Sequence, residues 1–428
     1  MRRKWLKGAL WVLLTPIVLF VILMILLYVP PVQNFIRKQA TAIASDATGM
    51  NISVERIDLR FPLNLLVRGV QVVQSEADAA DVQHPDTLLN LGSLNVSVQA
   101  WPLLQGRVEV NDITLQQVAV NSSNLLEGMH IKGTLGRFFL ESHGIDLKKE
   151  DAILNNVELS NTHMQVMLAD TTETPKDSTE TAVNWRIALH NLKLKNVSVD
   201  LQMPLDSMAL GANIGDASIE DANVDLKRQF YGWRRFTLTE SAVNYDSGMA
   251  APVEGFDASH IALRDIRIGI DSVMACGRDM NAIIREFSMY DRSGLTVTSL
   301  TGRLFADSTL IRIPYLQLKT PHSDMDLTAQ TYWKLVDIPT TGHLSARFNA
   351  NIGKQDVLLF AGGLPETFKE AYPFRPLVIH AGTEGNLKQM QISRFTAELP
   401  GAFFLSGGGE LWNLTDSLTR NGGLDFEM

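Results

Sequence analysis

The feature of this sequence that most constrains its fold is a strand-like alternation that breaks its own phase. In HNLKLKNVSVDL, which starts at residue 190, two apolar residues fall on even numbers and the next three on odd numbers: Leu192 and Leu194, then Val197, Val199 and Leu201. Side chains of a strand alternate between two faces, so a one-residue slip would move the apolar set to the wrong face. A β-bulge or tight β-arch inserts one residue, bends the strand and keeps the apolar set on one side.

The same slip recurs along the chain. Other strict copies begin at Ile52, Val108, Ala217 and Met390, and looser copies begin at Ile113, Val157, Ile261 and Ile311. Their uneven spacing argues against a solenoid of fixed period. The pattern predicts a long, irregular β structure that bends around one continuous apolar interior. The alternative is a hairpin-rich β protein in which the bulges coincide by chance.

Composition excludes several classes of protein. The chain has 428 residues, enough for two to four conventional domains or one extended architecture. Without the four basic residues that precede the first apolar run, 34 basic residues remain against 47 acidic ones, a net charge near −13. A body this acidic has no electrostatic footprint for nucleic acid, so we expect no nucleic-acid partner. Cys276 is the single cysteine, which excludes an intrachain disulfide and a Cys-rich zinc site.

The N-terminus predicts a membrane anchor. Residues 9–29, ALWVLLTPIVLFVILMILLYV, are uncharged and, as a helix, long enough to span a bilayer. Residues 1–8 carry four basic residues, so the positive-inside rule places them in the cytoplasm. A cleavable signal peptide is the alternative, but its apolar core would be shorter and would end near a small-x-small site. We therefore expect a retained, single-pass signal anchor.

A short amphipathic helix is expected to connect the anchor to the rest of the chain at residues 30–49. Pro30 and Pro31 close the anchor, and Gly49 ends the helical pattern. The apolar positions at helical spacing are Val32, Phe35, Ile36, Ala40, Ile43 and Ala47.

Strand patterning dominates the remainder. Residues 50–168 are expected to form a first β segment, and residues 169–182 a disordered loop, because they lack apolar periodicity. Residues 183–428 are expected to continue the β structure, with short helical insertions near residues 278–288 and 354–372. The last strand pattern stops without a cap, so we expect the chain to be truncated at residue 428.

Several stretches resemble AsmA-like proteins, including the TamB-like group. The opening GMNISVERIDLRFPLNLLVRGVQVV is similar to the strands that follow the membrane helix in that family, and Pro102 to Val120 is similar to its next element. Residues 293–325 and 379–414 resemble later parts of TamB-like proteins. Members of the TamB-like group are usually much longer and end in a characteristic domain that this sequence does not contain.

The resemblance implies a fold and a location. It implies an elongated, taco-like curved β-sheet with an apolar concave interior, anchored in the bacterial inner membrane and projecting through the periplasm. The family is associated with phospholipid transport between membranes and with outer-membrane biogenesis. It also implies that an outer-membrane β-barrel partner would bind through the missing C-terminal region.

The alternation itself suggests how such a sheet would act. A curved sheet with a continuous apolar lining could shelter acyl chains, since each CH₂ kept from water is worth about 0.8 kcal/mol. The alternative is that the same residues interdigitate as a dry core. The expected lining residues are Leu192, Leu194, Val197, Val199, Leu201, Ile219, Val224, Leu226, Ile266 and Ile268.

The sequence offers no constellation for catalysis. It contains no His-x-x-x-His pair, no G-x-S-x-G elbow and no phosphate-binding glycine loop, so we expect neither an enzyme nor a cofactor or metal site. The leading hypothesis is a lipid conduit between the inner and outer membranes. The alternative is a TamB-type translocation and assembly factor for outer-membrane proteins that acts by β-strand addition.

Overall fold

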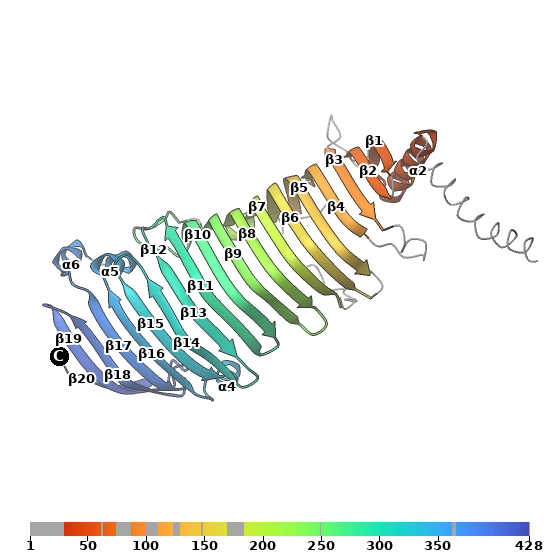
Figure 1. Ribbon diagram of the computed structural model, residues 1–428. Coiled ribbons are helices and arrows are strands. Elements are labelled where there is room, and N and C mark those ends of the chain that lie inside the picture. The colour runs from red at the N-terminus through yellow and green to blue at the C-terminus, as the bar shows by residue number, and fades with distance from the viewer. Residues whose placement is uncertain are drawn as a thin grey trace, which may run out of the picture. The chain divides into compact units, whose positions relative to one another are not determined.

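The computed structural model is mainly β, with twenty strands that belong to a single sheet and a few short helices (Figure 1). It describes residues 30–60, 63–73, 87–99, 110–122, 129–146, 149–168, 184–248, 250–361 and 365–427. The predicted cytoplasmic segment 1–8, the predicted anchor 9–29 and the predicted loop 169–182 lie outside these residues. Within the described ranges, no helix combines the length and apolarity needed to cross a bilayer. The chain divides into two compact units, residues 1–146 with 154–166, and residues 147–153 with 167–428.

The first unit is an antiparallel meander. Its strands are β1 (Asn51–Arg60), β2 (Asn64–Val73), β3 (Thr87–Val98), β4 (Val110–Asn121), β5 (Met129–Asp146) and most of β6 (Asp151–Leu168). From β1 to β5, each strand pairs with the next in the chain.

Helix α2 (Pro30–Thr48) confirms the predicted connecting helix and lies against β1. It begins at the two prolines, which suit the first turn of a helix because that turn does not need their N–H groups. Arg37 donates from Nη1 to the carbonyl oxygen of Glu55 at 2.6 Å, and Gln33 donates to that of Leu59 at 3.2 Å. The helix therefore satisfies carbonyl groups of β1, which blunts this strand as a site for another chain to pair.

The second unit is also an antiparallel meander, from β7 to β20. Its strands are β7 (Arg186–Met203), β8 (Met208–Asp225), β9 (Phe230–Ser247), β10 (His260–Cys276), β11 (Asp279–Asp291), β12 (Thr296–Val297), β13 (Ser299–Ala306), β14 (Leu310–Lys319), β15 (Asp324–Tyr332), β16 (Leu344–Ile352), β17 (Leu377–Gly385), β18 (Gln389–Leu399), β19 (Phe403–Trp412) and β20 (Asn421–Glu427). A 3₁₀ turn, η1 (Pro204–Asp206), joins β7 to β8. The helices are α4 (Trp333–Asp337), α5 (Lys354–Phe360) and α6 (Glu366–Ala371).

The phase slips are bends in the strands. On β7 the ladder to β8 steps from the Lys195–Asp216 pair to the Val197–Ile214 pair, and Asn196 adopts a left-handed φ of 54°. The residue at the bend turns the chain, so the apolar side chains before and after it stay on one face. The bend predicted from the opening motif is therefore confirmed.

The bends line up from strand to strand into what we call corner columns, sets of bend residues on neighbouring strands. In the first unit the column runs through Glu55, Gly69, Gly92, Gln117, Gly136 and Asn161. In the second unit the first column runs through Asn196, Gly215, Glu240 and Asp265, and a second runs through His190, Asp221, Arg234 and Ser272. The copies that start at Met390 and Ile311 carry register shifts at their slips as well.

One of the two predicted helical insertions is confirmed and the other is wrong. Residues 354–372 contain α5 and α6, as predicted. The helix predicted near residues 278–288 is wrong, because Asp279–Asp291 form strand β11. This segment pairs with β10 on one side and β13 on the other, and backbone pairing along both edges outweighs a weak local helical pattern.

Glycine is required where two corner residues approach closely. A Cβ on Gly136 would lie 2.8 Å from both the Cβ and the carbonyl oxygen of Asn161. We predict that Gly136→Ala destabilises the protein by about 1–3 kcal/mol, because the neighbouring backbone cannot yield. Urea unfolding followed by circular dichroism measures this loss.

Gly144→Ala is the matched control on the same strand, since a Cβ there would meet nothing within 4 Å. Equal stability of the two variants would contradict the close packing of the corner column.

Candidate functional site

The candidate site is the apolar face of strands β7 to β10 in the second unit. Residues directly opposite each other on neighbouring strands point to the same face, so the strand register shows which side chains lie together. One row runs Leu192, Ile219, Phe236, Ile270, and the next runs Leu194, Ala217, Leu238, Ile268. Neither row contains a polar side chain. We call these two rows the middle wall.

The apolar face continues beyond both corner columns. Past the first column, the first wall contains Val197 beside Ile214, the row Val199, Ala212, Val243, Leu263, and the row Leu201, Leu210, Tyr245, Ile261. Past the second column, the last wall consists of Ile187, Leu189, Ala222, Val224, Tyr231, Trp233, Val273 and Ala275. The bends therefore divide one apolar surface into three walls.

Eight of the ten predicted lining residues lie on these walls, and a ninth lies at a corner between them. Leu192, Leu194, Ile219 and Ile268 belong to the middle wall, Val197, Val199 and Leu201 to the first wall, and Val224 to the last. Ile266 lies at the first corner column, next to Asp265 and opposite Ser241. Leu226 does not lie on a wall, because β8 ends at Asp225 and Leu226 lies in the following turn. The corner of β9 at Arg234 was not predicted from the sequence. Its signal is nevertheless present, because Trp233 and Phe236 flank two consecutive arginines, which shifts the apolar alternation by one residue.

The apolar face is only partly buried. Of these nine predicted residues, Val197 and Ile266 are buried, and the others keep an intermediate exposure. Leu210 on the first wall is 37% exposed and Tyr231 on the last wall is 41% exposed. No side chain in the described part of the chain is fully buried. A second layer over this face would remove such side chains from water, so these exposures are typical of a single-layer sheet.

Several buried positions lie next to the corners. Val197, next to the corner residue Asn196, is 6% exposed, and Ile266, next to Asp265, is 4% exposed. Ser241, next to Glu240, is buried as well, and its hydroxyl donates to the carbonyl oxygen of Thr239 at 2.9 Å. Side chains crowd together on the inside of a bend and spread apart on the outside. The apolar walls therefore lie on the concave side of each bend.

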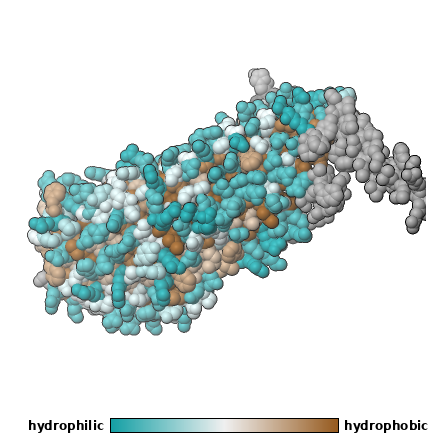
Figure 2. All heavy atoms as spheres, in the orientation of Figure 1, coloured by the Kyte–Doolittle hydropathy of each residue, from teal (hydrophilic) through white to brown (hydrophobic). Residues whose placement is uncertain are grey.

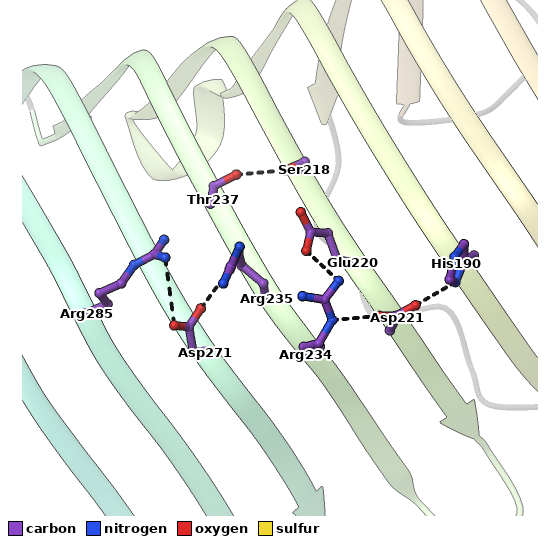
Figure 3. Close-up of polar contacts among 9 residues, drawn as sticks. All are labelled: His190, Ser218, Glu220, Asp221, Arg234, Arg235, Thr237, Asp271 and Arg285. Carbon is purple, nitrogen blue, oxygen red and sulfur yellow. Dashed lines mark hydrogen bonds and ion pairs between the residues drawn. The ribbon is translucent and has the colours of Figure 1, made fainter.

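The opposite face carries charged side chains, many of them paired (Figure 3). Arg234 donates from Nε to Asp221 at 2.6 Å and lies 2.8 Å from Glu220. Asp221 also lies 2.6 Å from His190, so these three corner residues form a chain across β7, β8 and β9. The hydrogen bond from Arg234 is the main cause that lowers the pKa of Asp221, and the same bond raises the pKa of Arg234.

A second group lies next to this chain. Asp271 on β10 accepts from Arg235 at 3.2 Å and lies 3.8 Å from Arg285 (Figure 3). In the space-filling view, polar side chains predominate on the face shown and apolar ones are visible between them (Figure 2). Within the described ranges, no cluster of histidine, cysteine and acidic side chains could hold a metal ion.

Comparison with known proteins identified neither a matching family nor a matching characterised protein. The geometry of the apolar face is therefore the basis for a functional proposal.

Substitutions within the apolar face distinguish bend positions from wall positions. We predict that Ile266→Ala destabilises the protein by about 2–4 kcal/mol, because Ile266 is buried at the inside of a bend. Val199→Ala on the open first wall should cost about 1 kcal/mol or less, since its side chain is already partly in water. Urea unfolding of both variants measures the difference. Similar losses would indicate that a second layer covers the wall.

The charged chain on the outer face predicts a dependence on pH. Because Asp221 has a lowered pKa in the folded state, its ion pair stabilises the protein above the ordinary value of 3.8 and is lost as the pH falls through the lower, folded value. We therefore expect Asp221→Asn to be less stable than the unmodified protein above about pH 5, with the difference shrinking below pH 3.8. Thermal unfolding at several pH values measures it. A stability difference for Asp221→Asn that does not shrink at low pH would contradict this prediction.

Proposed function

We propose that this protein carries phospholipid between the inner and outer membranes of a bacterium, with the acyl chains sheltered on the apolar concave face. Residues 9–29 would anchor it in the inner membrane, with the N-terminus in the cytoplasm and the body in the periplasm. The observation that carries the proposal is the middle wall, where two rows cross four strands without a polar side chain.

The energetics favour a long apolar ligand. An acyl chain of about 16 carbons loses about 13 kcal/mol on exposure to water, so it leaves a bilayer readily only if another apolar surface receives it. The walls offer side chains of similar chemistry on each successive strand. Contacts between hydrocarbons are not directional, so a chain could move from one strand to the next between nearly equivalent positions.

Two further features support this proposal. The apolar side chains are partly exposed, so a ligand gains area by covering them. The resemblance to AsmA-like and TamB-like proteins points to the same function, since that family is associated with lipid transport and outer-membrane biogenesis.

Strand addition to nascent outer-membrane proteins, the TamB-type alternative, requires an accessible sheet edge. The edge at β1 is next to α2, whose Arg37 and Gln33 already donate to carbonyl groups of that strand. This contact favours the lipid hypothesis over strand addition at this edge.

Photocrosslinking tests the proposal directly. A photoreactive side chain at Val199, on the first wall, should crosslink to phospholipid in cells, whereas the same group at Lys193, on the outer face of β7, should not. Mass spectrometry of the crosslinked and co-purifying lipids identifies the ligand. Equal crosslinking at both positions, or no lipid at either, would contradict the proposal.

A charge on the middle wall should block the ligand. We expect Leu194→Asp to lower co-purifying phospholipid at least tenfold, because the carboxylate would have to lose its hydration beside an acyl chain. Lys193→Asp, on the outer face of the same strand, is the control and should retain lipid. Circular dichroism establishes that both variants are folded.

A further inference from the structure

A hydrogen-bond donor without an acceptor lies on the last wall. Among the described residues, two buried side-chain groups lack a hydrogen-bond partner, the indole N–H of Trp233 and the hydroxyl of Tyr372. Tyr372 lies just after α6, whereas Trp233 is on β9 opposite Val273. The indole of Trp333, by contrast, donates to the carbonyl oxygen of Asp307 at 2.6 Å. Most buried donors have a partner, so an unsatisfied one on a proposed binding surface calls for an explanation.

The surroundings of Trp233 narrow the chemistry of a ligand. The eight inward side chains of the last wall carry two polar atoms, the indole nitrogen of Trp233 and the hydroxyl oxygen of Tyr231. The middle wall carries none. A ligand on these walls would therefore be apolar over most of its length and would present one acceptor near Trp233.

The acceptor should be uncharged. The guanidinium groups nearest in sequence, Arg234 and Arg235, form their ion pairs on the outer face with Asp221 and Asp271 (Figure 3). A phosphate brought to Trp233 would therefore lose its hydration without gaining a cation. An ester carbonyl needs one donor and carries no charge. It also adjoins the acyl chain of a glycerolipid directly.

We propose that the indole N–H of Trp233 donates a hydrogen bond to the ester carbonyl of a glycerophospholipid whose acyl chain lies on the middle wall. The headgroup then lies toward Tyr231, two residues or about 7 Å along the strand, where the last wall is exposed to water. The indole nitrogen is covered in the free protein, so the lipid reaches it by displacing partly buried side chains of the last wall. This inference rests on the proposed function and adds an orientation to it.

Lipids with ether linkages test the inference, because they lack the carbonyl but match ester lipids in headgroup and chain length. The purified full chain is incubated with vesicles of either lipid, and bound lipid is measured after re-isolation. We expect the unmodified protein to bind the ester lipid about fivefold more tightly, which corresponds to about 1 kcal/mol. Trp233→Phe, which removes the N–H but keeps an aromatic ring, should abolish this preference. Trp333→Phe is the matched control and should keep it.

The outcomes separate the two proposals. If the unmodified protein binds neither lipid, the proposed function fails. If it binds both equally, or if Trp233→Phe retains the preference for ester lipid, the function stands and the role of Trp233 is wrong. An equal loss of both lipids in Trp233→Phe would indicate that the ring acts by packing alone, which also overturns the inference.

Discussion

The structure depends on the bends at which single residues, polar or glycine, turn the strands. A strand that runs straight can keep its apolar side chains on one side of a flat sheet only. Asn196, Glu240 and Asp265 adopt a left-handed conformation, which is unfavourable for residues other than glycine. Each of them bends its strand and shifts the alternation of side chains by one residue. Their polar side chains suit the outside of the bend, while the buried positions Val197 and Ile266 occupy the inside. Because the bends coincide on neighbouring strands, β7 to β10 turn along two lines, the two corner columns, and their apolar side becomes concave.

The same geometry explains why the apolar face is incompletely buried. Crowding at each bend removes a few side chains from water, whereas most side chains of the walls between the bends keep an intermediate exposure. In a two-layer protein this area would be covered by helices or by a second sheet. Here the strands pair with their neighbours in sequence, and charged groups such as Asp221 and Arg234 occupy the other side. A surface that is apolar, concave and partly hydrated favours an apolar ligand.

The sequence predicted the bends well because their signal is local. Two polar residues between alternating apolar pairs mark Asn196 and Asp265 without any knowledge of the partner strand. The glycines of the corner columns were missed, since Gly136 matters only when it lies opposite Asn161 on another strand. The helix expected near residues 278–288 failed for the same reason, because its strand pairing is not local. Leu226 continues the alternation of the apolar residues on β8, but alternation does not indicate where a strand ends.

The spacing of the corners sets the width of the middle wall. On β7 the two corners are His190 and Asn196, and on β8 they are Gly215 and Asp221. On each strand the two corners are six positions apart. On β9 they are also six residues apart, which corresponds to about 20 Å of extended chain. Because this distance is constant across three strands, a lipid carried in the proposed way would meet a wall of unchanged width. Apolar contacts alone give such a ligand no fixed orientation, so a single unsatisfied donor at one edge of an otherwise uniform wall has a disproportionate influence on how the ligand lies.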